Sequence, residues 1–342
     1  METELNKRST SIRDYRLRPV SLDDLHIILG IINAFSQHFM GVNEIDEGEL
    51  RNFLTSPDLN MAQDLRLLLS PEGVAVGYVE CTLTDDPPVH PFIYLRVLPE
   101  YLDSQIPEHL MAWANEHAHS ALAMCPLDLR ISVQTFNAVE AVPMAKLFHS
   151  HGFQIIRASY QMWIDLDKST PAPGWPQDIE LRPFVEAQHI EALYRAYDQS
   201  FSDHFGYVKR PCEIGLKRFR HMVVEDAAHD PTLCFVAWDG DQVAGFSLCY
   251  KDSSEDVNMG WLGLLGVPRP WRNRGLGKAL LLLTFEEFRK RGKTRVGLGV
   301  DASNLTGALA LYENVGMYVA RRYDRYEKEL KPGKELMTTE LS

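Results

Sequence analysis

The sequence predicts an α/β (α+β) protein made of two similar layered domains in tandem. Strand-like and helix-like runs follow one another in the same order in both halves of the 342-residue chain, a pattern typical of layered α/β domains. Short landmarks also repeat at offsets of 164 to 168 residues. They are Leu17-Arg18-Pro19 with Leu181-Arg182-Pro183, Val76-Gly77-Tyr78 with Ala244-Gly245-Phe246, and Gly152-Phe153 with Gly316-Met317. Such self-similarity indicates an internal duplication.

The duplication predicts five segments. They are an N-terminal tail (1–12), a first domain (13–166), a linker (167–178), a second domain (179–331) and a C-terminal tail (332–342). The linker contains Pro171, Pro173, Gly174 and Pro176, a composition typical of semi-rigid, extended connections.

Composition indicates a cytoplasmic protein outside the membrane. Hydrophobic residues make up 45% and charged residues 24%, and the length suits two domains of ordinary size. No apolar run approaches the roughly 20 residues that span a bilayer. The opening METELNKRST lacks the apolar segment of a signal peptide. The five cysteines are odd in number and mostly in apolar surroundings, so we expect reduced packing residues.

Each half predicts the same elements in order: an opening strand, one or two helices, a hairpin, a long strand, a helix, a strand, a helix and closing strands. In the second half the hairpin spans 233–238 and 243–250, joined by the turn-forming Asp239-Gly240-Asp241. The expected central strands cover 261–267 and 294–300, the following helix 306–314, and the closing strand 321–330.

A phosphate cradle is predicted at residues 267–278, VPRPWRNRGLGK, where a strand turns into a helix. Gly275 and Gly277 have no Cβ, so the backbone there can approach a ligand closely. The unpaired N–H groups and the dipole at a helix start attract anions. Residues 269–295 also hold nine Lys or Arg against two acidic residues, although the whole chain has a net charge of −12. These features indicate a small polyanionic ligand.

Two better-known phosphate loops do not fit these residues. Arg272 and Ala279 stand where a P-loop needs Gly and Ser or Thr, and Leu280 stands where a dinucleotide fingerprint needs its third Gly.

The pattern V-x-x-x-x-R-x-x-G-x-G, from Val267 to Gly277, instead resembles the acyl-coenzyme-A loop of the GCN5-related N-acetyltransferases (GNAT). The downstream order is also similar: a strand, a loop with Asn304, a helix with Tyr312, then Gly316. The resemblance covers residues 260–330. It implies two GNAT-like domains, each with a mixed, splayed central β-sheet flanked by helices. It also implies acetyl-CoA as co-substrate, with its pantetheine arm in the splayed gap, and no metal.

The resemblance implies roles for individual residues. Coenzyme binding would involve Leu265, Gly266, Val267, Arg272, Asn273, Arg274, Gly275, Leu276, Gly277, Lys278 and Asn304. Main-chain N–H groups around Leu265 and Val267 would polarise the thioester carbonyl, and Tyr312 would be the general acid that protonates the departing thiolate. Alternatives remain for three of these positions. Tyr312 fits core packing, Asn304 fits a helix N-cap, and the cationic Arg274 and Lys278 fit a solvated helix start.

No single residue stands out as the general base. Glu255 and Asp256 precede the strand at 261–267, near where relatives place a carboxylate, although acidic loops are common without a catalytic purpose. His204 has a suitable unperturbed pKa of about 6.5. It lies in an aromatic segment that would either line the acceptor pocket or pack against other aromatic side chains.

The first half lacks the key positions. Alignment of Val97 with Val267 places Leu102, Gln105 and Pro107 opposite Arg272, Gly275 and Gly277, and Phe148 opposite Tyr312. We expect a degenerate domain that walls the acceptor pocket; a different ligand there is the alternative. A tandem pair with one working copy resembles the mycothiol synthase family, and residues 201–206 are similar to a segment of that family's C-terminal half.

The sequence therefore predicts an acyl-CoA-dependent N-acyltransferase that transfers acetyl to a small amine through its C-terminal half. The alternatives are an acyl-CoA-binding sensor or interaction protein and a protein N-acetyltransferase. Metal binding is disfavoured because His117 with His119 and His149 with His151 have i, i+2 spacing. Nucleic-acid binding is disfavoured because the basic cluster is explained by the coenzyme and the remaining chain is acidic. The oligomeric state is left open.

Overall fold

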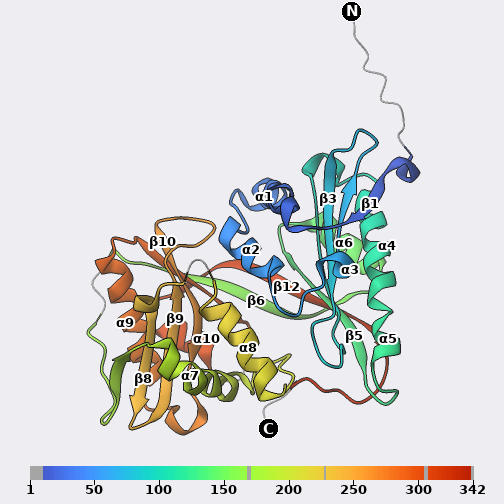
Figure 1. The fold of residues 1–342 in the computed structure, drawn as a ribbon. Helices are drawn as coiled ribbons and strands as arrows, with labels where there is room; N and C mark the ends of the chain where they lie inside the picture. The colour runs from blue at the N-terminus through green and yellow to red at the C-terminus, as the bar shows by residue number, and fades with distance from the viewer. Residues whose placement is uncertain (1–10, 168–170, 227–228, 304–306, 340–342) are drawn as a thin grey trace, which may run out of the picture.

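The computed structural model describes residues 11–167, 171–226, 229–303 and 307–339. Figure 1 shows two lobes, one from each half of the chain, with strands β6 and β12 crossing between them. A single 12-stranded sheet runs through both lobes in the order β1-β2-β3-β4-β5-β12-β6-β11-β10-β9-β8-β7. The mixed α/β architecture that the sequence predicts is confirmed.

Twelve α-helices and strands are described in the first half, besides short 3-10 helices. They are β1 (Arg16–Pro19), α1 (Leu25–Met40), α2 (Glu47–Leu54), α3 (Met61–Asp64), β2 (Leu65–Leu69), β3 (Ala75–Thr82), β4 (Phe92–Val97), α4 (Ile106–Ala118), α5 (Ala121–Met124), β5 (Ile131–Ala138), α6 (Val142–Ser150) and β6 (Gln154–Asp165). Side chains alternate across a strand. Leu67 accordingly packs with the α1 and α2 cluster, and Leu68 with the α4 and α6 cluster on the opposite face.

The second half contains β7 (Glu180–Pro183), α7 (Glu186–Phe201), α8 (Cys212–Val223), β8 (Cys234–Asp239), β9 (Gln242–Tyr250), β10 (Met259–Gly266), α9 (Leu276–Lys290), β11 (Arg295–Asp301), α10 (Ala308–Asn314) and β12 (Tyr318–Lys331). The predicted hairpin is confirmed. Strands β8 and β9 pair antiparallel, and the turn between them passes through Gly240, whose φ of 57° suits a residue without a Cβ.

The central strands of the second half splay apart. Strands β10 and β11 pair in parallel from Met259 with Arg295 to Leu262 with Leu298, and their ladder ends there although both strands continue. The first half repeats this arrangement, because β4 and β5 share only the pair of Phe92 with Gln134. The splayed gap that the resemblance implied is therefore present in the second half.

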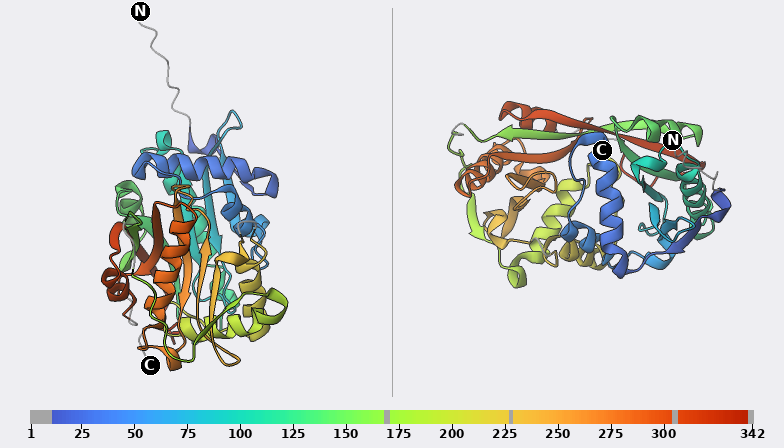
Figure 2. Two further views of the ribbon diagram at one scale, coloured as in Figure 1. Left: turned by 90° about the vertical axis from the view of Figure 1, so that its left-hand side faces the viewer. Right: turned by 90° about the horizontal axis from the view of Figure 1, so that it is seen from above.

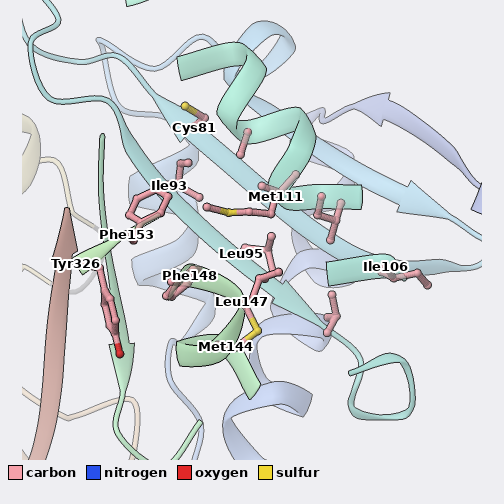
Figure 3. Close-up of a cluster of buried hydrophobic side chains, with 14 of the residues drawn as sticks. Cys81, Ile93, Leu95, Ile106, Met111, Met144, Leu147, Phe148, Phe153 and Tyr326 are labelled. Carbon is pink, nitrogen blue, oxygen red and sulfur yellow. The ribbon is translucent and has the colours of Figure 1, made fainter. Parts of the chain in front are cut away.

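The closing strands are exchanged between the halves. Strand β6 of the first half pairs with β11 of the second, and β12 of the second half pairs with β5 of the first. The two exchanged strands also pair with each other along one side of both lobes (Figure 2). The side chains of each exchanged strand pack in the core of the other half. Met162 and Ile164 of β6 lie in the core of the second half. Tyr326 of β12 packs into the core of the first half (Figure 3).

Two further features concern the chain as a whole. The described residues include no helix with the length and hydropathy needed to cross a membrane. All five cysteines are free thiols, and four of them are buried while Cys212 is exposed. The sequence limits of the two domains, at residues 166 and 331, stay a prediction.

Candidate functional site

The loop before α9 has the backbone of an anion cradle. Asn273 and Gly275 have φ values of 61° and 84°, and Gly275 is the N-cap of α9. The first N–H that turns back into the helix is that of Ala279, which donates to the Gly275 carbonyl at 3.0 Å. The three amides before it therefore point out of the helix start. At Gly277 a Cβ would lie 3.3 Å from Leu311 Cδ2, so this close approach favours glycine.

Asp203 anchors the cradle loop to the end of α7. Arg269 pairs with it, and Arg272 Nη1 donates to Asp203 Oδ2 at 2.7 Å. Hydrogen bonds, the largest from Arg269, lower the pKa of Asp203 to about 2. Arg272 also donates to the carbonyls of Val267 at 2.9 Å and Ser200 at 3.1 Å. Its guanidinium thus holds the loop in place.

Most of the local positive charge is neutralised by ion pairs. Seven of the nine cations between residues 269 and 295 are paired: Arg269 and Arg272 with Asp203, Arg289 and Lys290 with Glu286, Arg291 with Asp230 and Glu287, Lys293 with Asp252, and Arg295 with Asp165. Arg274 and Lys278 have no ion-pair partner among the described residues, and both are exposed. The charge count from sequence therefore overstated the free positive charge near the cradle.

A cavity of about 550 Å³ connects the cradle with the splayed strands. Its lining includes the predicted Leu265, Gly266, Val267, Arg272, Asn273, Gly275, Leu276, Gly277, Lys278, His204 and Tyr312. Strand β11 forms the facing wall from Leu298 to Asp301. Arg274 does not line the cavity, and Asn304 lies outside the described residues. Residues up to 112 positions apart in the sequence thus meet in one space.

Tyr312 lies on α10 at the wall of this cavity. The residue is 7% exposed, and burial raises the pKa of its hydroxyl to about 12. The hydroxyl makes no hydrogen bond to a described residue, although the residue lines open space. A phenol with this pKa stays protonated at neutral pH and can donate a proton to a strong base that forms beside it.

His204 lies in the same cavity, beside Phe201, with ring centroids 4.5 Å apart. Burial and the nearby Arg272 charge lower the pKa of His204. Its imidazole is therefore neutral at neutral pH, and it is a weaker base than a solvated histidine.

The two loop acids lie outside the cradle cavity and have structural partners. Glu255 forms an ion pair with Arg321, with Oε2 and Nη2 3.0 Å apart. Asp256 accepts hydrogen bonds from the backbone N–H of Asn258 at 2.8 Å and from its side chain at 3.2 Å. Neither contact brings a carboxylate to the cradle.

The equivalent position in the first half lacks these features. Gln105, with φ of −78°, is the N-cap of α4, and Pro107 follows in the first turn. Proline has no N–H, so one donor of the cradle is absent. Phe148 is 1% exposed and packs in the core shown in Figure 3. These contacts explain in physical terms why the first half is expected to be degenerate.

Within the part of the chain that the structure describes, no three His, Cys, Asp or Glu side chains form a group able to hold a metal ion. The histidines of the two pairs have other partners, since His117 contacts Asp64 at 2.9 Å and His151 contacts Glu108 at 2.6 Å.

Sequence reasoning missed the anchoring role of Asp203 and a set of carboxylates in the first half, Glu44, Glu49 and Glu80. Asp203 lies within residues 201–206, and the similarity of this segment to one of the mycothiol synthase family was the only available signal. The three glutamates are brought together by tertiary structure and have no common spacing.

Comparison with known proteins agrees with this geometry. Residues 190–317 match the model of the Acetyltransferase (GNAT) family. A mycothiol acetyltransferase of Thermobispora bispora is 31% identical over 175 residues, which cover 50% of this chain and 57% of that protein. The chain thus spans little more than half the length of this curated relative.

Two solved structures follow the chain over nearly its whole length. A GCN5-related N-acetyltransferase from Sphaerobacter thermophilus has a TM-score of 0.74 and 28% identity, with 94% of this chain and 98% of that chain covered. A tandem GNAT protein from the clavulanic acid biosynthesis pathway has a TM-score of 0.70 and 16% identity, with 94% and 100% covered. The second likeness concerns the fold alone.

Proposed function

We propose that this chain transfers acetyl from acetyl-CoA to the amine of a small molecule through its C-terminal half. This proposal is supported by the match of residues 190–317 to the Acetyltransferase (GNAT) family model and by the likeness of the whole chain to a solved GCN5-related N-acetyltransferase. The observation that carries this proposal is the single cavity of about 550 Å³ that joins the anion cradle to Tyr312. A coenzyme with a phosphate end and a reactive thioester end needs both in one continuous space.

The residues present fit this co-substrate. The amides of Leu276, Gly277 and Lys278 at the start of α9 suit the pyrophosphate, and the unpaired charge of Lys278 suits an additional phosphate oxygen. The pantetheine arm would follow β10 beyond Leu262, where the ladder with β11 has ended. Main-chain groups from Leu265 to Val267 then supply hydrogen bonds that orient the thioester.

The reaction needs a nucleophile, a polarised carbonyl and a proton for the leaving group. The amine nitrogen attacks the thioester carbonyl carbon, the new C–N bond forms, and the C–S bond breaks. The thiolate that leaves takes a proton from the Tyr312 hydroxyl, a general-acid contribution worth about 10² to 10⁴ in rate. We assign His204, which is neutral and partly buried, to the wall of this cavity.

The N-terminal half has a supporting role in this proposal. Pro107 removes a cradle donor, and Phe148 has no hydroxyl, so one coenzyme molecule is expected to bind per chain. A calorimetric titration of the whole protein with acetyl-CoA measures this stoichiometry directly. Two equal sites would contradict the assignment of binding to the C-terminal half.

The deciding experiment measures free coenzyme A released from acetyl-CoA in the presence of a panel of primary amines, with mass spectrometry of the acetylated product. Release that depends on an amine, with matching product, supports the proposal. Acetyl-CoA binding without release under any amine would instead support an acyl-CoA-binding sensor.

A further inference from the structure

A second cavity, of about 600 Å³, lies between the two halves and meets the cradle cavity at Gly299. Gly299 lies on β11 and lines both spaces. A Cβ built on Gly299 finds no atom within 4 Å, so this point of the strand is open. Gly297 lies two residues earlier on the same face of β11, and the Trp261 ring fills the space beside it. A Cβ built on Gly297 would lie 2.7 Å from that ring. Gly299 is therefore the residue that the two cavities share, and we infer that they connect at this point.

The wall that the first half contributes is mainly apolar and includes five aromatic rings. Its rings are Phe53, Tyr78, Phe92, Tyr94 and Phe136. Several contact one another, with Phe92 and Phe136 stacked at 5.9 Å between centroids. The half that lacks a coenzyme loop thus builds an apolar surface opposite the open point of β11.

The rest of the wall comes from the exchanged strand β6 of the first half and from strands of the second half. Tyr160 of β6, Trp261 of β10 and Tyr323 of β12 line the same cavity. Among the described residues that line it there is no Lys, Arg or His. The cavity therefore offers ring faces and carboxylates to a ligand, a combination that suits an organic cation.

Three of the four carboxylates in the lining are already neutralised. Glu44 forms an ion pair with the buried Arg96 at 2.6 Å, and Glu255 forms one with Arg321. Glu80 accepts a hydrogen bond from the Tyr78 hydroxyl at 2.8 Å, and burial raises the pKa of Glu80 to about 8. At neutral pH this group is mostly uncharged.

Glu49 is the exception. It lies in the first turn of α2, where its Oε2 accepts the Asp46 N–H at 3.0 Å in a capping box, and no described cation forms an ion pair with it. Burial raises the pKa of Glu49 to about 7, with Asp46 and Asp226 adding repulsion and Ser254 opposing the shift through a hydrogen bond. A base that titrates near neutral pH is matched to proton transfer.

We propose that this second cavity is the acceptor site, that it takes an aromatic primary amine, and that Glu49 receives the proton which the amine loses. The inference rests on the proposed acetyl transfer and names its substrate class. An ammonium gives one proton to the Glu49 carboxylate, directly or through water, and becomes a free amine. The amine lone pair attacks the thioester through the opening at Gly299. The nitrogen loses its second proton to solvent as the C–S bond breaks, and the thiolate is protonated by Tyr312.

The chemistry of the lining selects against polar acceptors. A sugar amine would bring several hydroxyl groups to a lining of mostly rings and aliphatic side chains, in which Glu44, Glu80 and Glu255 already have partners. Each unmet hydrogen bond costs about 1 to 3 kcal/mol. An aromatic amine instead places its ring among rings and its nitrogen near carboxylates. The first half therefore determines which amine is acetylated by the second.

The test uses the full-length protein with 2-phenylethylamine as the aromatic probe and glucosamine as the polar one. We expect kcat/KM for 2-phenylethylamine to exceed that for glucosamine by about tenfold or more. Glu49→Gln keeps the capping hydrogen bond and removes the charge, so the helix is preserved. This variant should lose about 10²-fold in kcat/KM at pH 7, with acetyl-CoA affinity unchanged. In the parent protein, ionisation of Glu49 should make the rate rise as the pH increases through about 7. The rate of Glu49→Gln should not show this rise.

Glu47→Gln is the matched control, because Glu47 lies on the same helix but is exposed and pairs with Arg51. It should retain the parent rate and pH profile. A second variant, Gly299→Leu, fills the opening on a strand with no backbone strain, and it should abolish transfer to 2-phenylethylamine. Because Gly299 also lines the coenzyme cavity, the acetyl-CoA affinity of this variant is measured alongside.

The outcomes separate the two proposals. A preference for glucosamine, or full activity and an unchanged pH profile in Glu49→Gln, would overturn the acceptor assignment and leave acetyl transfer standing. Full activity of Gly299→Leu would overturn the passage between the cavities. Binding of acetyl-CoA with no transfer to any amine of the panel would overturn the proposed function itself.

Discussion

Phe148 and Tyr312 occupy the same position in the two halves. The carbonyl of each accepts a hydrogen bond of 3.0 Å from the amide five residues later, that of Phe153 or Met317. In both cases the glycine before that amide has a positive φ, 86° at Gly152 and 97° at Gly316. The first half fills the position with an apolar ring in its core, whereas the second places a hydroxyl beside a cavity.

This equivalence makes Tyr312→Phe a clean variant, since the protein already accommodates phenylalanine at the matching site. We expect kcat to fall by about 10² to 10⁴ while acetyl-CoA affinity stays near that of the parent, because only an interaction in the transition state is removed. Steady-state kinetics with a calorimetric titration measure both. Unchanged turnover would mean that Tyr312 only packs.

Gly275→Glu should abolish acetyl-CoA binding, because it adds bulk and negative charge at the cradle. Gly292→Glu is the control, since Gly292 has a similar φ of 78° against 84° and equally open space at the far end of α9. Both variants share the cost of a left-handed non-glycine residue, about 1 to 2 kcal/mol. Only Gly275→Glu should lose binding by calorimetry, and equal affinities would remove the cradle from the coenzyme site.

Asp203→Asn tests whether the anchor sets the shape of the cradle loop. The substitution removes the charge that holds Arg269 and Arg272, so we expect acetyl-CoA Kd to rise by about tenfold. Asp165→Asn, which loosens the exposed pair with Arg295 instead, serves as the comparison and should bind normally. If both variants bind as the parent does, the anchor has no part in coenzyme binding.

The raised pKa of Glu80 predicts that the stability of the protein falls as the pH rises. Its pKa is about 8 in the folded protein against 4.5 for the free side chain, with Arg96 and Glu44 facing it. Between these values the folded state keeps a proton that the unfolded state releases. The free energy of unfolding therefore declines as pH rises from about 4.5 to about 8, by up to ~1.4 kcal/mol per pH unit.

Denaturant titrations of Glu80→Gln should show a flatter profile across this range, because glutamine still accepts from Tyr78 but does not ionise. Glu72→Gln, at an exposed turn before β3, should keep the parent slope. A parent stability that rises from pH 5 to pH 8, or a slope equal in all three proteins, would contradict the assignment.

The sequence predicted local features well and long-range ones poorly. The hairpin at Gly240, the splayed strands and the cradle were predictable because each depends on residues close in sequence or on a motif of fixed spacing. Contacts between residues far apart in the sequence were not. Glu255 was expected near the reacting amine from its place before β10, and its pairing with Arg321, 66 residues later, has no local signal.

Charge was the other failure, for a related reason. Counting residues between 269 and 295 treated every cation as available, but acids from distant elements, such as Asp203 and Asp252, neutralise most of them. Ion pairs that join elements far apart in sequence appear only when the chain is folded.

The exchange of β6 and β12 has a consequence for the order in which the protein can form during synthesis. Domains generally fold one by one as they leave the ribosome, beginning with the N-terminal one. Here β5 cannot complete its pairing before β12, whose paired residues follow 185 to 200 positions later, and the partners of β6 on β11 follow 130 to 142 positions later. A ribosome that stalls before residue 318 would release a first half with an open strand edge, a template for aggregation. The half without a coenzyme loop therefore cannot be trimmed away, because the sheet of the other half is built on its last strand.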